Sequence, residues 1–384
     1  MTEQFDPPER TARAAARQAP ASAQEVLAGR MLLQVSPRRV GYFAAHLYPN
    51  RSGLILSGKG SDPSAKAADL RQHNHLGVVL ADPARYLNQI ATAEQPFIPA
   101  PDQALPFGIL EEAVLTQLAR GADAAISPTG YIEAEDSGAL IAAAEQITAY
   151  NHPRLVFAVP ISNAWLREPS LGQLIAVLKD VPGIKAVMFG GQNDPIGSLK
   201  HGVANLRSLV EQVPGLALMR TDIAALGALA HGAEFAAFGM GSTQRHIIAP
   251  GQETDRSPRS GLSPSVLFPA LKSFFLGESI ARRFAVTPEE QVPTCACGIC
   301  RGGALDRFTT QANQREAMAH NVAVMMGWAG QLSTAVSRKN APAWWAEQCA
   351  EAVEQHGAVN RLVKGPNGFK VAAQLAQWAA GAED

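Results

Sequence analysis

Residues 216–240, LALMRTDIAALGALAHGAEFAAFGM, decide the fold of this 384-residue chain. Two short apolar runs, at 216–221 and 234–240, flank a segment in which the apolar residues recur with helical spacing. Both runs are continuous rather than alternating, which is typical of parallel strands covered on both faces. The stretch therefore predicts one strand–helix–strand unit of a parallel sheet.

The same unit recurs from about residue 53 onward. Six or seven such units in about 200 residues favour a (β/α)8 TIM barrel over an open, doubly wound sheet. The eighth strand has no clear signature, and we expect it between residues 243 and 275. The strands are predicted at 53–58, 76–82, 122–128, 154–162, 184–191, 216–221 and 234–240.

The chain divides into three predicted parts. Residues 1–30 read as a flexible N-terminal arm, 31–285 as the barrel, and 286–384 as a zinc-binding, mostly helical subdomain. Beyond the strand-rich region, the apolar spacing predicts helices near 266–283, 306–336, 342–356 and 367–381.

Composition restricts the class of protein. With 47% hydrophobic residues the chain can bury a large core, and a formal net charge of −1 gives no global preference for nucleic acid or anionic membranes. No apolar run reaches the roughly 18 residues of a membrane helix. The N-terminus has no apolar signal core, and its acidic residues argue against a transit peptide. We therefore expect a cytoplasmic protein.

Three of the four cysteines lie in TCACGICRGG, residues 294–303, as C-x-C-x-x-C. Thiolates at this spacing converge on a tight loop and leave one tetrahedral position for a fourth ligand. His320 and Cys349 are the two candidates. A disulfide, or buried thiols that bind nothing, are the alternatives, and a cytoplasmic location disfavours the disulfide. The preferred interpretation is a structural Zn²⁺ site formed by Cys295, Cys297, Cys300 and His320.

The C-x-C-x-x-C motif, followed by His320-Asn321 on a helix behind a (β/α)8 barrel, resembles the tRNA-guanine transglycosylase family. VMFGGQND at 187–194 looks like the family's Gly-Gly loop, and residues 221–240 look like its stretch leading to the nucleophile strand. The resemblance implies exchange of guanine for a 7-deazaguanine base in tRNA or DNA. It also implies a structural zinc ion and a homo- or heterodimer.

The catalytic positions that this resemblance implies are altered. The family's early Asp-Ser-Gly-Gly motif falls on LADPARY, which keeps Asp82 but loses the glycines. The nucleophile position falls on Ala237, or on Phe238 if the register slips. Asp82 or Asp194, each at a predicted carboxyl end of a strand, is the candidate substitute carboxylate. Asp82 and Asp194 each precede a proline and also read as Asp-Pro turn residues, and Asp222 reads as a helix cap.

The base pocket implied by the resemblance contains four positions. Gly190 and Gly191 would present their backbone to a purine or 7-deazapurine base, although a simple strand-end turn explains them equally well. The family's base-recognising aspartate falls near Thr129, and its pocket glutamine falls near Ile161.

Basic residues follow the seventh predicted strand and could contact nucleic acid, but only if they share one face. The Trp344-Trp345 pair and Trp378 have helical spacing and are expected to be packing anchors. The basic residues are Arg245, His246, Arg256, Arg259, Lys272, Arg282, Arg283, Arg301, Arg307 and Arg315.

These observations leave more than one function open. The first is a transglycosylase-like enzyme with an altered active site that exchanges a base in tRNA or DNA. The second is a non-catalytic member that binds nucleic acid or serves as the partner subunit of an active transglycosylase. A third is a barrel enzyme that acts on a small molecule and retains the zinc scaffold.

Overall fold

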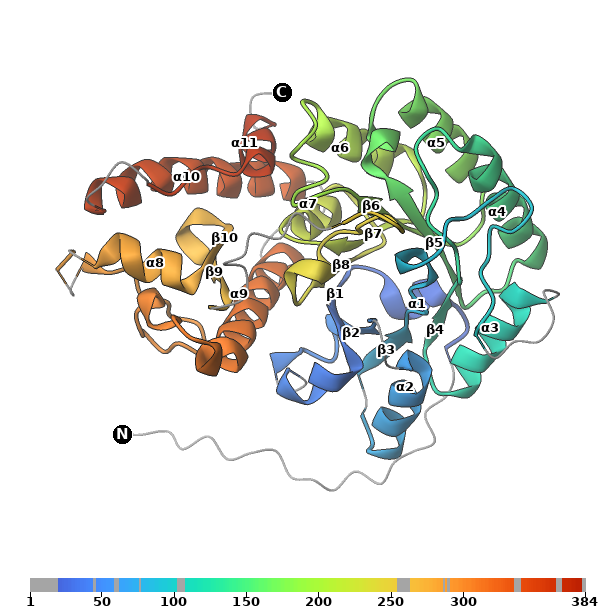
Figure 1. The fold of residues 1–384 in the computed structure, drawn as a ribbon, viewed down its shortest axis with the longest axis horizontal. Helices are drawn as coiled ribbons and strands as arrows, with labels where there is room; N and C mark the ends of the chain where they lie inside the picture. The colour runs from blue at the N-terminus through green and yellow to red at the C-terminus, as the bar shows by residue number, and fades with distance from the viewer. Residues whose placement is uncertain are drawn as a thin grey trace.

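The computed structural model describes residues 20–43, 46–58, 62–75, 77–101, 108–253, 263–285, 287–288, 291–334, 340–363 and 368–381. Eight parallel strands close into a barrel, with helices in the connections, which confirms the predicted (β/α)8 fold (Figure 1). The strands are β1 (Arg30–Val35), β2 (Ser52–Leu56), β3 (Val78–Ala81), β4 (Ala124–Ile126), β5 (Leu155–Ser162), β6 (Ile184–Gly190), β7 (Leu216–Thr221) and β8 (Phe235–Gly239).

The prediction for the eighth strand was wrong. The missing strand is β1, which precedes all the predicted ones and pairs with both β2 and β8. Its connection to β2 contains no α-helix among the described residues, only a 3₁₀ turn at Pro37–Tyr42, so the strand–helix period does not extend to it. The region expected to hold the strand instead contains an antiparallel hairpin outside the barrel, formed by β9 (Ser265–Phe268) and β10 (Ser273–Leu276).

The end of the predicted arm is also ordered. Residues 23–27 form helix α1 (Ala23–Leu27), and Leu27 is fully buried with the side chains that fill the barrel interior. The amide of Ala23 donates to the carbonyl of Pro153, and that of Gly29 donates to Glu234. Helix α1 therefore covers the amino-terminal end of the barrel. Residues 1–19 of the predicted arm lie outside the described residues.

Two apolar layers follow from the alternation of side chains along each strand. Leu32, Met188 and Ala217 belong to the interior cluster, whereas their neighbours pack against the helices outside. Because both faces are covered, the strands read as continuous apolar runs. The outer helices are α2 (Pro63–Gln72), α3 (Ile109–Ala119), α4 (Ser137–Tyr150), α5 (Ser170–Leu178), α6 (Gly202–Gln212) and α7 (Ala224–Ala230).

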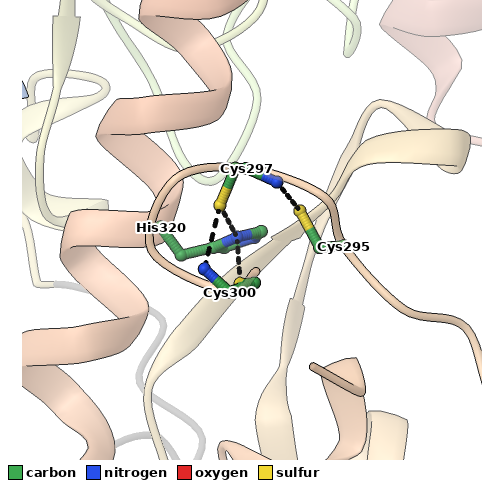
Figure 2. A group of neighbouring side chains, drawn as sticks. All are labelled: Cys295, Cys297, Cys300 and His320. Atoms are coloured by element: carbon green, nitrogen blue, oxygen red, sulfur yellow. Dashed lines mark hydrogen bonds between the residues drawn. The ribbon is translucent and has the colours of Figure 1, made fainter. Parts of the chain in front are cut away.

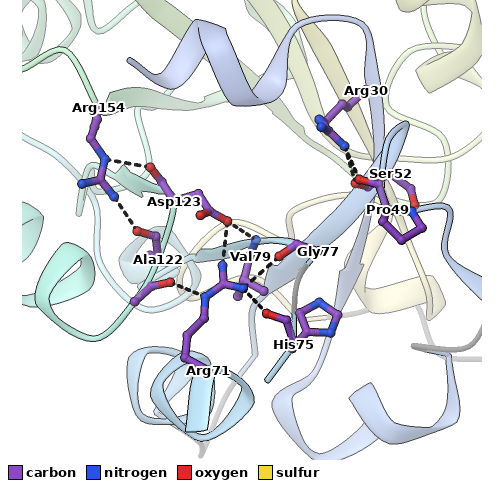
Figure 3. Close-up of polar contacts among 11 residues, drawn as sticks. Arg30, Pro49, Ser52, Arg71, His75, Gly77, Val79, Ala122, Asp123 and Arg154 are labelled. Atoms are coloured by element: carbon purple, nitrogen blue, oxygen red, sulfur yellow. Dashed lines mark hydrogen bonds and ion pairs between the residues drawn. The ribbon is translucent and has the colours of Figure 1, made fainter. Parts of the chain in front are cut away.

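Arginines join the strands at the amino-terminal end of the barrel (Figure 3). Arg71 donates to the carbonyls of His75, Gly77 and Gly121 and pairs with Asp123 at 2.7 Å. Arg154 donates to the carbonyls of Ala122 and Asp123. These cations donate to carbonyls of the residues that directly precede β3 and β4.

The C-terminal part packs beside β1, α6 and α7 (Figure 1). It contains the β9–β10 hairpin and helices α8 (Gly277–Phe284), α9 (Gln314–Thr334), α10 (Ala341–Leu362) and α11 (Ala373–Ala380). The single helix predicted at 266–283 was wrong in its first half, because β9 and β10 occupy residues 265–276. No described helix combines the length and apolarity needed to cross a bilayer.

Two tryptophans anchor this part to the barrel. Trp345 and Trp378 are 1% and 2% exposed, and their rings lie 6.5 Å apart. Trp378 lies so close to Gly227 of α7 that a β-carbon there would clash with its ring. The structure therefore confirms the packing role predicted for Trp345 and Trp378.

We predict that Arg71→Met lowers the free energy of unfolding by about 3 kcal/mol, because it removes the ion pair to the buried Asp123 carboxylate. Urea denaturation measures the change. The control is Arg120→Met, which removes the exposed pair between Arg120 and Asp62 and should cost less than about 1 kcal/mol. Equal losses in both variants would contradict the assignment.

Candidate metal centre and barrel mouth

Cys295, Cys297, Cys300 and His320 meet at one point, and their ligand atoms all lie within 4.8 Å of one another (Figure 2). His320 Nδ1 is 3.5 Å from Cys297 Sγ and 3.2 Å from Cys300 Sγ. None of the four cysteines forms a disulfide. Three sulfurs and one nitrogen in this arrangement could hold a metal ion in tetrahedral geometry.

The cysteine loop is closed by its own backbone. The amide of Gly302 donates to the carbonyl of Cys295, and the amide of Arg301 donates to that of Cys297. Arg301 and Gly302 both have left-handed backbone conformations, which reverse the chain immediately after the last cysteine. Amides also approach the sulfurs, with Cys297 N 3.5 Å from Cys295 Sγ and Cys300 N 3.5 Å from Cys297 Sγ. These donors favour thiolates.

A second set of contacts orients the ligands. His320 Nε2 lies 2.7 Å from the carbonyl oxygen of Leu267 in β9, which leaves Nδ1 directed at the cysteines. Its neighbour Asn321 accepts from the amide of Leu267 and donates to the carbonyl of Ser265. The His-Asn pair thus joins helix α9 to both the cysteine loop and the hairpin.

The protonation of the cluster is consistent with ligand chemistry. Burial acts to lower the pKa of His320, but its contacts with Cys297 and Cys300 raise it to about 9. Hydrogen bonds from Cys295 and Cys300 lower the pKa of the Cys297 thiol. Arg307 adds positive charge, with its guanidinium 3.1 Å from Cys300 Sγ. A metal ion bound by deprotonated thiols would take the place of these shared protons.

Cys349 lies elsewhere. It is fully buried in α10, and burial raises the pKa of its thiol to about 12 despite the nearby Lys272 ammonium. Of the two candidate fourth ligands, the structure brings only His320 to the cluster.

At the carboxyl end of the barrel, Asp82 lies at the centre of a buried polar network. Its Oδ2 accepts from Gln34 at 3.0 Å, from Ser57 at 2.8 Å and from the Tyr86 hydroxyl at 2.5 Å. Its Oδ1 accepts from the amide of Ala84 at 2.8 Å. The residue is fully buried, so its carboxylate is held by internal donors and does not face solvent.

Arg220 completes this network from β7. Its guanidinium lies 3.4 Å from Ser57 Oγ, 3.3 Å from the Tyr86 oxygen and 2.6 Å from the carbonyl of Thr243. Its φ of 50° is unusual for a residue with a side chain, so the surrounding contacts must stabilise that conformation. Burial raises the pKa of Tyr86 against the opposing effect of Arg220, and the phenol stays a donor. No motif predicted the role of Arg220.

The loop after β8 covers the mouth. Ile247 is fully buried with the interior side chains, its amide donates to Phe189, and its carbonyl accepts from Gly191. Gly190 pairs with Ile247 and lies so close to Tyr131 that a β-carbon would clash with the phenol. The two glycines therefore lie at the mouth as expected, but their backbone contacts the chain's own loop.

The other two predicted base-binding residues, Thr129 and Ile161, do not lie together. Thr129 is fully buried after β4 and shares a 2.7 Å hydrogen bond with Ser127. Ile161 packs in the outer layer between the sheet and the helices, so the structure does not bring it to the mouth. Ala237 points into the barrel interior, and no acidic side chain follows it before Glu253.

Asp194 lies in the turn after β6, close to Asp222 at the end of β7. Asp194 Oδ1 accepts from the amide of Gly197 at 2.8 Å and from Gln374 Nε2 at 2.9 Å, so it links α11 to the barrel. Asp222 accepts from Ala224 at the start of α7. Burial, followed by the charge of Asp194, raises the pKa of Asp222 to about 6. Both residues have the capping and turn roles that their sequence context also allowed.

A cavity of about 580 Å³ lies off the barrel axis beside the loop of Asp82. Gly58, Pro83 and Pro128, which follow β2, β3 and β4, form one wall, and Arg85 and Arg120 also line it. Ile247 does not line this cavity and is instead buried among the interior side chains of the barrel.

The predicted basic residues do not share one surface. Arg245 stacks on Phe274, with its guanidinium carbon 3.4 Å from the ring centre, and Lys272 is only 7% exposed. Arg307 pairs with Glu316 at 2.8 Å, whereas Arg282, Arg301 and Arg315 are exposed. Arg256 and Arg259 lie outside the described residues.

No family model and no curated protein matches this chain. Among solved structures, the carboxyl transferase domain of Rhizobium etli pyruvate carboxylase with pyruvate and biocytin is 14% identical, with a TM-score of 0.36 over 99% of this chain and 68% of that chain. A tyrosine-to-alanine variant of that domain with pyruvate gives 14% identity and a TM-score of 0.35 over the same shares. Likeness at this level carries no functional argument.

We predict that the purified protein contains about one metal ion per chain and that Cys297→Ser removes it. The serine hydroxyl is a poor substitute for a thiolate ligand. Elemental analysis by mass spectrometry measures the content. Cys349→Ala is the control, because that thiol lies outside the cluster, and it should keep the metal. A metal-free wild-type protein would show that the cluster is not a metal centre.

A second prediction concerns pH. Because the pKa of Asp222 is raised to about 6 in the folded protein, the folded state binds more protons than the unfolded state between pH 4 and 6. This residue therefore makes stability fall as pH rises through that window. Asp222→Asn keeps a capping side chain and removes the charge. We expect the variant to gain about 2 kcal/mol over wild type above pH 6 and nothing near pH 4. Chemical denaturation at pH 4 and 7 compares them, and a pH-independent difference would refute this assignment.

Proposed function

We propose that this chain is a tRNA-guanine transglycosylase-like protein that binds nucleic acid without carrying out base exchange in its own barrel. The observation that carries the proposal is the sealed mouth. Ile247 is buried among the interior side chains, Asp82 is held by four internal donors, and Ala237 occupies the expected nucleophile position. Covalent catalysis on a ribose needs a reachable carboxylate. At the two positions that the resemblance implies, Asp82 is fully buried and Ala237 has no carboxylate.

We further propose that the metal is zinc. Three thiolates and one imidazole form a donor set that Zn²⁺ prefers, and a Zn–S bond of about 2.3 Å fits sulfurs gathered as closely as these. Four protein ligands leave no open position, so the ion would be structural. It would fasten α9 to the cysteine loop through His320. Free thiols at this site suit a reducing compartment such as the cytoplasm.

A second candidate is base exchange with Asp82 as the substitute nucleophile or proton-handling group. Its support is the position of Asp82 at the carboxyl end of β3, where barrel enzymes place their catalytic residues. Arg220, Tyr86 and Gln34 would then orient it. This function requires the loop after β8 to move, because Arg220 donates to Thr243 of that loop and Ile247 covers the axis.

The experiment is to incubate the purified protein with labelled guanine or 7-deazaguanine and unmodified tRNA or duplex DNA, and to measure nucleic-acid binding in parallel. We expect binding at low salt and no incorporation of the base. Incorporation that Asp82→Asn abolishes would establish the second candidate instead. Failure to bind either nucleic acid at low salt would overturn both and favour a small-molecule function at the off-axis cavity.

A further inference from the structure

The connection between β1 and β2 runs along helix α9. The Arg39 guanidinium is 3.9 Å from Met318 Sδ, and the guanidinium of Arg315 stacks over the ring of Tyr42 at 4.7 Å. Farther along the helix, Gly330 lies near Arg51. A β-carbon built on Gly330 would be 4.0 Å from a terminal guanidinium nitrogen of Arg51. Because Arg315 and Gly330 are fifteen positions apart on one helix, these contacts follow a strip about 22 Å long.

The strip is basic. Residues 30–52 contain four arginines and neither aspartate nor glutamate. Arg38, Arg39 and Arg51 are exposed on the connection, and Arg315 is exposed on the helix. The acidic neighbour on the helix, Glu316, is paired with Arg307. The formal net charge of −1 for the whole chain does not show this local excess of positive charge.

The strip also exposes aromatic rings. Tyr42 and Tyr48 are 42% and 57% exposed. Tyr48 lines a groove of about 740 Å³ together with His46, Trp328 and Gln331, and the cysteine loop at Cys297 also lines it. The ammonium of Lys272 lies 4.6 Å from the centre of the Trp328 ring.

We propose that this strip, defined by Arg38, Arg39, Tyr42, Tyr48, Arg51 and Arg315, binds a single-stranded segment of nucleic acid. Arginines contact the phosphates, and the tyrosines stack on bases, a combination that tracks single strands without base-edge readout. The inference rests on the nucleic-acid partner of the proposed function and locates it away from the barrel mouth.

The positive charge of the strip favours nucleic acid over a second copy of the chain as its binding partner. A symmetric dimer through the strip would bring two basic strips against each other, because an isologous interface uses the same surface on both copies. Such like-charge contact is unfavourable across an interface, whereas a polyanion neutralises it and releases counterions. A polyanion with exposed bases therefore fits both the charges and the rings.

The test uses the full-length protein and a fluorescein-labelled 15-nucleotide oligouridine, with a 15-base-pair RNA duplex for comparison. Fluorescence anisotropy at several salt concentrations gives the Kd and its salt slope. We expect preference for the single strand, a roughly tenfold weaker Kd for Tyr48→Ala through lost stacking, and a shallower salt slope for Arg51→Gln through one lost phosphate contact. The control is Arg167→Gln, an exposed arginine on the barrel beyond β5, which should change neither.

Metal content and thermal unfolding of each variant show that the fold is retained. If wild type binds oligouridine and the strip variants bind equally well, the strip is not the site, although the proposed function stands. If wild type binds no nucleic acid, the proposed function fails as well. Conversion of a dimer to a monomer by Tyr48→Ala, seen by light scattering, would make the strip an interface between copies and overturn the inference.

Discussion

The pairing of β1 with β8 is the constraint on which the rest of the molecule depends. Arg30 to Gln34 align with Phe235 to Gly239, and this register closes the sheet without an edge. Closure gathers the carboxyl ends of all eight strands around one mouth. Gln34, Ser57, Asp82 and Arg220 come from β1, the ends of β2 and β3, and β7, yet they form a single buried network because the ring is closed. An open sheet would leave β1 and β7 far from each other.

The same closure explains why the mouth is internally satisfied. A buried carboxylate and a buried guanidinium are costly unless their hydrogen bonds are complete. Tyr86, Ser57 and Gln34 supply donors to Asp82, while Arg220 donates to the loop after β8 and so fastens that loop over the barrel. A substrate that displaced Ile247 would also have to replace the contacts of Arg220. This coupling supports the proposal that no base exchange takes place in this barrel.

The cysteine cluster joins segments of the C-terminal part rather than strands of the barrel. His320 joins α9 to the metal loop through Nδ1 and to β9 through Nε2, so one side chain connects three segments of the C-terminal part. Helix α9 in turn borders the β1–β2 connection, where the basic strip lies. A metal ion that fixes α9 would thereby fix one side of the proposed nucleic-acid surface. If the proposed surface binds nucleic acid, the cluster would support that binding through α9.

By itself, the sequence determined seven of the eight strands and the cysteine–histidine ligand set. Both are local patterns. A continuous apolar run indicates a buried strand, and C-x-C-x-x-C spacing indicates thiols that can bind one metal ion. Only the tertiary structure decided that β1 completes the ring, since a strand without a following helix lacks the repeating signature. It also decided that Asp82 is enclosed, that Ile161 faces the outer layer and that Arg220 joins the mouth. Those properties depend on which side chains meet across the barrel, and hydrogen-bond partners 48 or 186 residues apart leave no local pattern in the chain.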